Sequence, residues 1–222
     1  MPEKITALLI LLLSAALPVC AQSSASDSPE DVQFWNETQI FLPLREGTDL
    51  VLFGVLRQGR DLARPVDERG GVGFAFKANK YLTFTPTWLY IAQQPTATRK
   101  NIEHRLILNA TVKFALGNFN FTDRNLIERR LRHARSDFTM YRNRLQIDHP
   151  ARLGSFKFRV FVADEVWYDA LQRAWTRNRV SAGIIRQFSP RFAGEFFYLR
   201  QNDGRARPGD LHVIGTLFRI RL

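Results

Sequence analysis

Residues 102–116 read IEHRLILNATVKFAL, and their side chains alternate between two chemical classes. One class is apolar and comprises Leu106, Leu108, Ala110, Val112, Phe114 and Leu116. The other is polar or charged and comprises Glu103, Arg105, Asn109, Thr111 and Lys113. Because successive side chains of a β-strand point to opposite faces, this period of two predicts one long strand with an apolar face and an ionic face.

The same alternation recurs from Asp31 onward. In the last segment, Ile214, Thr216, Phe218, Ile220 and Leu222 oppose Gly215, Arg219 and Arg221. Eleven segments carry the pattern: 32–42, 49–58, 71–79, 81–93, 102–116, 119–131, 137–148, 156–166, 175–188, 192–201 and 211–222. The sequence therefore predicts an all-β chain that forms a single β-barrel domain over residues 31–222. Many segments are longer than the roughly 5–6 residues typical of strands in soluble sheets.

Composition excludes several classes of protein. The chain has 222 residues, 45% of them hydrophobic and 24% charged, which excludes a disordered or collagen-like chain. One cysteine cannot form an intramolecular disulfide, and no Cys/His cluster has zinc spacing, so we expect no metal and no cofactor. The net charge is +11, and arginine supplies 26 of the 32 basic residues. This bias favours geometry-specific contacts with anions, because the guanidinium is a planar fork of donors.

The N-terminal segment predicts export. Residues 1–21 place Lys4 before an apolar stretch and end on Val19-Cys20-Ala21, which is typical of a secretory signal peptide. A lipoprotein signal with Cys20 as the lipidated residue is the alternative. Residues 22–30, QSSASDSPE, form a polar and flexible leader in this interpretation.

No later apolar stretch reaches the roughly 18 residues of a transmembrane helix, so a membrane-bound chain must cross with strands. Four features favour an antiparallel up-and-down transmembrane barrel in the outer membrane of a Gram-negative bacterium. The strands are long enough to cross a bilayer at a tilt, for which roughly 9–11 residues suffice, and short and long connections alternate. Aromatic residues lie near predicted strand ends, at Phe34-Trp35, Trp88-Tyr90, Trp167-Tyr168 and Trp175. The closing Phe218–Leu222 resembles the signal by which the barrel insertion machinery recognises its substrates.

The sequence also allows other interpretations of the fold, of one segment and of the strand number. A soluble periplasmic lipocalin-like barrel would show the same alternation. Residues 126–133, LIERRLRH, could form a helix with i,i+4 pairs in place of a strand. The strand number is also in question, because barrel insertion normally requires an even number. The barrel has ten strands if residues 31–42 lie partly inside it and do not belong to its wall. It has twelve, the number we favour, if one of the long loops contains a further strand.

Several short motifs, taken in order, resemble those of one bacterial family. They are Asp31–Glu37 (DVQFWNE), Glu103–Arg105 (EHR), Tyr141–Leu145 (YRNRL), Asp164–Trp167 (DEVW), Asn178–Gly183 (NRVSAG) and His212–Gly215 (HVIG). Together they resemble the domain-of-unknown-function family 2490 over nearly the whole mature chain. The resemblance implies an exported barrel of the outer-membrane type and assigns it no activity.

If the apolar faces meet lipid, the ionic faces line the lumen. The expected inward cations are Arg105, Arg130, Arg132, Arg142, Arg144, Arg159, Arg177, Arg179, Arg219 and Arg221, with Lys113 and Lys157. The expected acidic partners are Glu37, Glu103, Glu128, Glu165 and Glu195. Basic rings favour anions in a pore, so one hypothesis is a small anion-preferring pore or binding site for carboxylated, sulfated or phosphorylated solutes. The other is that Arg–Glu ladders plug a passive structural module.

Catalysis and nucleic-acid binding have little support in the sequence. His104 and Glu103 are adjacent on a strand and point to opposite faces, so they do not form an acid–base pair. The alternative of a lipid-modifying outer-membrane enzyme would need a His–Ser/Glu cluster that the sequence does not reveal. The arginines follow strand parity instead of forming one patch, and we therefore expect no nucleic-acid partner. Basic loops such as 124–135 and 205–207 could bind lipopolysaccharide phosphates.

Overall fold

The computed structural model describes residues 30–94, 100–133, 135–206 and 208–222. The predicted signal peptide 1–21, the alternative lipidation site Cys20 and leader residues 22–29 lie outside these ranges. Within the described residues, no helix has the length and apolarity needed to cross a membrane.

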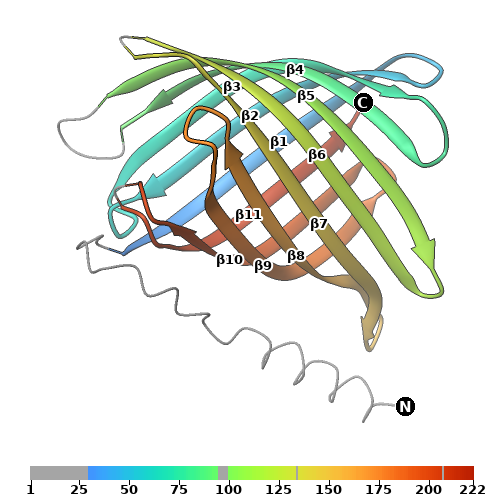
Figure 1. Ribbon diagram of the computed structural model, residues 1–222. Helices are drawn as coiled ribbons and strands as arrows, with labels where there is room; N and C mark the ends of the chain where they lie inside the picture. Colours follow the sequence, from blue (N-terminus) through green and yellow to red (C-terminus); the bar gives the residue numbers. More distant parts are fainter. Residues whose placement is uncertain (1–29, 95–99, 134, 207) are drawn as a thin grey trace.

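Eleven strands form one closed barrel (Figure 1). They are β1 Asp31–Arg45, β2 Thr48–Gly59, β3 Arg64–Lys77, β4 Leu82–Gln93, β5 Asn101–Leu116, β6 Phe119–Arg132, β7 Phe138–Leu153, β8 Phe156–Asp169, β9 Ala174–Ser189, β10 Phe192–Asp203 and β11 Leu211–Arg221. Each strand pairs antiparallel with the next in sequence. The predicted all-β barrel is therefore confirmed, and its predicted antiparallel pairing holds for every pair of strands that are consecutive in sequence.

The expectation of ten or twelve strands is wrong. The barrel closes with an odd number because β1 and β11 pair in parallel, from Asp31 opposite Leu211 to Phe41 opposite Arg221. Residues 31–42 belong to the wall and not to the interior. Residues 64–70, expected in a loop, extend β3 and pair with β2, so that loop holds no additional strand. Residues 126–132 pair with β5 and β7 as part of β6, which excludes the helical alternative.

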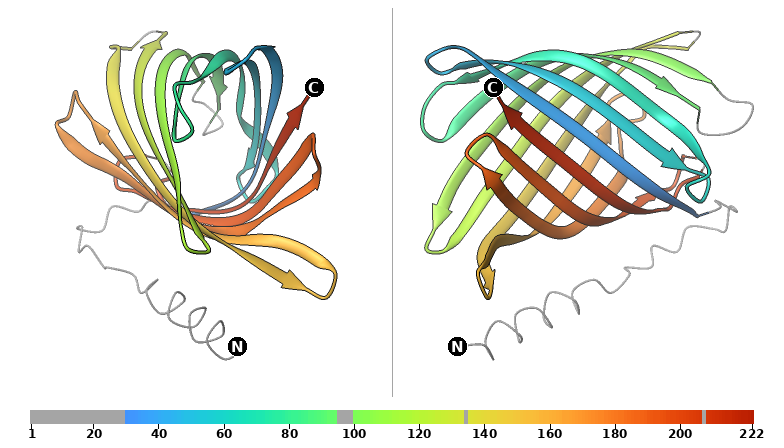
Figure 2. Two further views of the ribbon diagram at one scale, coloured as in Figure 1. Left: turned by 90° about the vertical axis from the view of Figure 1, so that its right-hand side faces the viewer. Right: turned by 180° about the vertical axis from the view of Figure 1, so that it is seen from behind.

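The two ends of the barrel differ in their connections (Figure 2). At one end, which we name the short-turn end, the strands are joined by residues 46–47, 78–81, 117–118, 154–155 and 190–191. Gly47, Gly117 and Gly154 adopt positive φ in three of these turns. At the other end, the long-loop end, the connections are 60–63, 94–100, 133–137, 170–173 and 204–210. The C-terminus lies at the short-turn end, and Asp31 lies at the long-loop end.

Inward-facing aspartates hold three connections at the long-loop end. Asp31 accepts hydrogen bonds from the backbone N–H groups of Arg60 and Asp61, at 3.0 and 2.9 Å. Asp169 and Asp203 each accept two such bonds from the loop that follows them. These buried carboxylates therefore serve local backbone geometry, since loop N–H groups without a partner are costly.

The parallel closure of the barrel has side-chain contacts of its own. Arg200 on β10 donates to Glu30, just before β1, at 3.0 Å and to Asp210, just before β11, at 2.9 Å. His212 lies between Arg200 and the Tyr198 hydroxyl, which is 2.6 Å from its Nδ1. This cluster joins the first and last strands on the outer face.

The outer face carries an apolar band between two aromatic belts. Exposed side chains of the band include Leu52, Leu56, Leu106, Leu108, Ile127, Val180 and Ile214. The short-turn belt consists of phenylalanines: Phe74, Phe76, Phe84, Phe114, Phe119, Phe156, Phe188 and Phe196. The long-loop belt contains Trp88, Tyr90, His104, Trp175 and Tyr198. Such belts are typical of strands that cross a bilayer, where amphipathic rings lie at the head-group level.

Two of the aromatic residues expected in these belts lie elsewhere. Trp35 and Trp167 are buried inside the barrel, whereas their neighbours Phe34 and Tyr168 face outward. The expectation was wrong because closeness to a strand end does not determine which face a side chain meets. Odd or even position along the strand does, since adjacent strand residues point to opposite faces.

Polar side chains interrupt the apolar band on β6 to β9. Asp123 accepts hydrogen bonds from the amides of Asn125 and Asn143, at 2.8 and 2.7 Å. Asp164 on β8 accepts one from Asn178 on β9, at 2.6 Å. Each of these groups therefore has a hydrogen-bond partner on a neighbouring position of the outer wall, which lowers the cost of placing it there.

Candidate functional site

The inner face of the barrel holds the charged residues singled out in the sequence. Strand register and burial place on this face Arg105, Arg130, Arg132, Arg142, Arg144, Arg159, Arg177, Arg179, Arg219 and Arg221, with Glu37, Glu103, Glu128, Glu165 and Glu195. Lys113 and Lys157 share the same parity. The structure divides these residues into groups with different partners.

Glu128 is the centre of the first group. Its side chain is 0% exposed, and it accepts hydrogen bonds from Arg130 at 2.8 Å and from Arg142. Arg105 lies 3.5 Å from the same carboxylate and also pairs with Glu103. Arg105, Arg130 and Arg142 come from the neighbouring strands β5, β6 and β7, so a single buried carboxylate connects three adjacent strands.

Arg142 extends this network to Glu165. Its second terminal nitrogen lies 2.5 Å from Glu165 Oε1, and Arg179 Nη1 lies 3.6 Å from Glu165 Oε2. Arg179 also donates to Gln201 on β10 at 2.8 Å. The chain of contacts therefore runs continuously from β5 to β10. Buried charges are tolerated when paired and hydrogen-bonded in this way.

Trp167 occupies the middle of this network and was not expected there. The ring is 3% exposed, and the guanidinium carbons of Arg142, Arg177 and Arg179 lie 4.2, 4.2 and 4.4 Å from its centroid. Arg130 is more distant, at 5.6 Å. Stacking of cations on a desolvated tryptophan is favourable by about 2 kcal/mol. The parity of Trp167, shared with Glu165, is the sequence signal that would have found it.

A second buried group lies toward β1 and includes ions that the sequence analysis missed. Asp67 pairs with Arg69 at 2.5 Å and with Arg57 at 3.5 Å. Arg57 and Arg179 both stack on Trp35, at 3.7 and 4.7 Å from its centroid. Trp35 is on β1 and Arg179 is on β9, so their contact connects two strands that are not neighbours in the sheet. Asp67 and Arg69 were missed because residues 59–70 were expected in a loop.

Together the two groups fill the interior toward the long-loop end. Apolar side chains complete this packing, with Ile91, Leu126, Leu199, Leu211 and Val213 all buried. Arg177 is also paired, with Asp203 at 2.5 Å. We name this region the plug and define it by Trp35, Trp167, Glu128, Glu165 and the arginines around them.

The interior toward the short-turn end is more accessible. Its ion pairs are Arg219 with Glu195 at 2.5 Å, Arg221 with Asp49 at 2.7 Å, and Arg159 with Asp148. In each pair the carboxylate is buried, whereas the arginine side chain is 38%, 43% and 41% exposed, respectively. Solvent therefore reaches the inner wall here and not at the plug.

Inward cations without an acidic partner lie along the described strands of this half. Within the part of the chain that the structure describes, no carboxylate oxygen lies within 4.0 Å of a side-chain nitrogen of Lys113, Arg124 or Arg144. Arg124 and Arg144 are directly opposite each other on β6 and β7. Arg144 donates to the amide oxygen of Gln146, at 2.8 Å. Arg124 was expected in a basic loop over residues 124–135, but it lies within β6 and shares the parity of Glu128. We name these three residues the open basic cluster.

The remaining predicted cations do not join this cluster. Arg132 lies at the long-loop rim, where it donates to the carbonyl of Ser136 at 2.8 Å and stacks on Phe138. Lys157 lies at the β7–β8 hairpin opposite Arg152. Glu37 accepts a hydrogen bond from Gln39 at 2.6 Å.

The histidines lie outside the interior. Glu103 is buried on the inner face, whereas His104 is on the outer face, stacked on Trp88 with ring centroids 5.6 Å apart. Among the described residues, no group of three or more His, Cys, Asp or Glu side chains is arranged to hold a metal ion.

Comparison with known proteins gives one family match. Residues 32–211 match the family described as "Protein of unknown function (DUF2490)". No curated protein matches the chain.

Solved structures with a similar arrangement include three barrels. LpxR from Salmonella typhimurium gives a TM-score of 0.49 at 9% identity, over 78% of this chain and 83% of that one. The NanC porin gives 0.47 at 13% identity, over 86% of this chain and 96% of that one. An anion-selective porin from Comamonas acidovorans gives 0.41 at 12% identity, over 79% of this chain and 54% of that one.

Proposed function

The chain belongs to the DUF2490 family, and on this premise we propose that it is an outer-membrane barrel that binds small anions in the short-turn half of its interior. The open basic cluster is the observation that carries the proposal. Lys113, Arg124 and Arg144 supply positive charge on an accessible inner wall without the carboxylates that neutralise the arginines of the plug. The role proposed is binding or passive transport, not catalysis.

The ligand class follows from the donors. Two guanidiniums that face each other across β6 and β7 can each present two parallel N–H groups to an oxyanion. Two like charges opposite each other destabilise an empty site, and a bound anion relieves that repulsion. Small carboxylates, sulfate and phosphate fit this arrangement. Arg142 and Arg177, two of the arginines expected to line the lumen, contribute less because Glu128, Glu165 and Asp203 already pair with them.

The proposed orientation follows from the connections. Outer-membrane barrels have short periplasmic turns and longer external loops, so the open basic cluster would face the periplasm and the plug would face the cell exterior. An anion-preferring pore is the second candidate, favoured by the excess of inward cations. The filled plug supports binding from one side over open conduction.

Anion binding should depend on the open basic cluster. In purified detergent-solubilised protein, we expect Arg124→Ala/Arg144→Ala to weaken binding of inorganic sulfate at least tenfold in calorimetric titrations. A hydrogen bond to a charged group is worth about 1.5–3 kcal/mol, and about 1.4 kcal/mol is a tenfold change in affinity. The matched control is Arg152→Ala/Lys157→Ala, which removes two cations from the adjacent hairpin. Equal sulfate affinity of the wild type and the cluster variant, or no sulfate binding by either, would contradict the proposal.

Membrane residence is tested separately. The apolar band and the two aromatic belts support the outer membrane over the soluble periplasmic alternative, because water would meet many exposed Leu, Ile and Phe side chains. In a fractionated Gram-negative host, we expect the mature chain in the outer-membrane fraction, with release only by detergent. Recovery as a detergent-free monomer in the periplasmic fraction would contradict this placement.

A further inference from the structure

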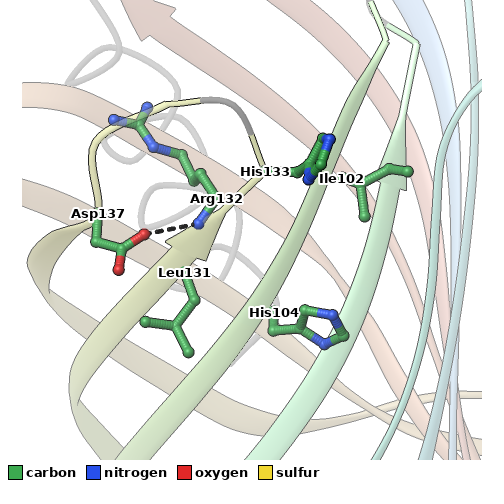
Figure 3. A pocket seen from close by; sticks show the side chains of 6 residues that line it. All are labelled: Ile102, His104, Leu131, Arg132, His133 and Asp137. Atoms are coloured by element: carbon green, nitrogen blue, oxygen red, sulfur yellow. Dashed lines mark hydrogen bonds between the residues drawn. The ribbon is translucent and has the colours of Figure 1, made fainter.

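We propose that a cavity on the outer face, at the long-loop end, binds a phosphorylated lipid of the outer leaflet. The cavity lies between the start of β5 and the β6–β7 connection, with a volume of about 350 Å³ (Figure 3). Its lining consists of Ile102, His104, Leu131, Arg132, His133 and Asp137. The inference depends on the proposed membrane placement of the barrel, but not on anion binding in the interior.

The lining changes from apolar to polar toward the loop. Leu131 lies opposite His104 on the outer wall, and Ile102 lies on β5 beside His133. In Figure 3, Leu131 and His104 lie on one side of the cavity, and Asp137 lies on the loop above. A lipid fits this lining, because its acyl segment would contact the apolar part toward the bilayer and its head group would contact the polar part toward water.

The position of the cavity along the barrel agrees with a head-group site. His104 belongs to the long-loop belt and contacts Trp88 and Tyr90. Tryptophan and tyrosine belts mark the depth of lipid head groups. Since the long-loop end is expected to face the cell exterior, the cavity would open at the outer leaflet, where phosphorylated lipopolysaccharide lies.

The charge of the cavity selects an anion. The only carboxylate in its lining, that of Asp137, accepts a hydrogen bond from the Arg132 backbone N–H at 2.9 Å and lies 3.8 Å from the Arg129 guanidinium. Arg129 is about half exposed on the outer face, and its other contact is a long hydrogen bond of 3.4 Å to Thr139. Its guanidinium therefore has donors free for a phosphate at the edge of the cavity, where it meets Asp137, and His133 is an exposed residue of the lining.

A second, smaller cavity adjoins the first. It has a volume of about 160 Å³ and shares Ile102, Arg132 and His133 with the first. Glu103 and Arg130, which belong to the ion network of the plug, also line it, and Arg135 adds an exposed cation at the rim. A water occupies about 30 Å³ in the liquid, so the larger cavity fits a phosphate and a short acyl segment, not a whole lipid. The remaining acyl chains would lie on the apolar band.

Native mass spectrometry of the protein in dodecylmaltoside tests the site, with bisphosphorylated lipid A as the probe. We expect Arg129→Ala/His133→Ala to lower the affinity for lipid A at least tenfold. The matched control is Arg186→Ala/His149→Ala, which removes the same two side-chain types from the outer face near the short-turn belt. We expect this control to bind as the wild type does. Lipid A from which both phosphates have been removed should bind at least tenfold more weakly to the wild type.

Three results would overturn the inference. They are equal lipid A binding by Arg129→Ala/His133→Ala and the wild type, equal binding of the dephosphorylated lipid, and displacement of lipid A by millimolar inorganic phosphate. The last would show a phosphate site without a lipid component. Leu131→Asn leaves every charge in place and should also weaken the binding of lipid A, which tests the apolar part. Sulfate titration of the same samples keeps the two proposals distinct, because a wild type that binds sulfate but not lipid A contradicts only this inference.

Discussion

Glu128→Ala should destabilise the barrel by about 3–5 kcal/mol, the effect of removing one partner from a buried ion network. The Glu128 carboxylate is fully buried and pairs with Arg105, Arg130 and Arg142. Its removal leaves three guanidiniums close together with one buried negative charge fewer between them. Equilibrium urea unfolding in detergent micelles measures the change in free energy of unfolding.

Two further variants show whether charge or cavity formation causes this loss. Glu128→Gln keeps the shape and some hydrogen bonds but removes the charge, and we expect it to fall between the wild type and Glu128→Ala. Glu68→Ala makes the same truncation at an exposed position on β3 and should remain within about 0.5 kcal/mol of the wild type. The plug would have no structural role if the alanine variants at positions 68 and 128 unfolded alike.

The alternation of side chains was sufficient to predict the barrel wall. In residues 102–116 the period of two separates Leu106 and Leu108, which face outward, from Glu103 and Arg105, which face inward. The prediction succeeds because the geometry of a strand alone determines toward which face each side chain points. The parallel pairing of β1 with β11 could not be predicted in this way, because facing says nothing about which strand closes the barrel.

The division of the interior into a plug and an open basic cluster depends on which carboxylate each arginine reaches. Arg142 and Arg144 lie on the same face of β7, yet Arg142 pairs with Glu128 and Glu165, whereas Arg144 donates to Gln146. Position across the strands does not decide this, because Glu165 lies directly opposite Arg144 and Trp167 lies opposite Arg142. The sequence therefore predicts which residues face inward but not how their charges pair.

Trp167→Ala should convert the closed interior into a conducting one. The ring is the surface on which Arg142, Arg177 and Arg179 stack, so its loss removes the packing that holds these side chains together. The space left by the indole ring is lined by guanidiniums and carboxylates, and a polar space as large as an indole ring fills with water. In planar bilayers, we expect at least tenfold higher single-channel conductance than in the wild type. A KCl gradient should give a reversal potential of the sign expected for chloride preference, because the open basic cluster then lies on the path.

A matched substitution separates this effect from the general loss of a tryptophan. Trp175 is on the same hairpin but belongs to the outer belt, where it contacts Tyr168 with ring centroids 5.4 Å apart. Trp175→Ala should therefore leave the conductance at the wild-type level. Trp167→Leu provides a more conservative variant if the alanine variant does not form the heat-modifiable barrel band on denaturing gels. If a folded variant at Trp167 conducts no better than Trp175→Ala, or prefers cations, then Trp167 and its arginines do not close this barrel.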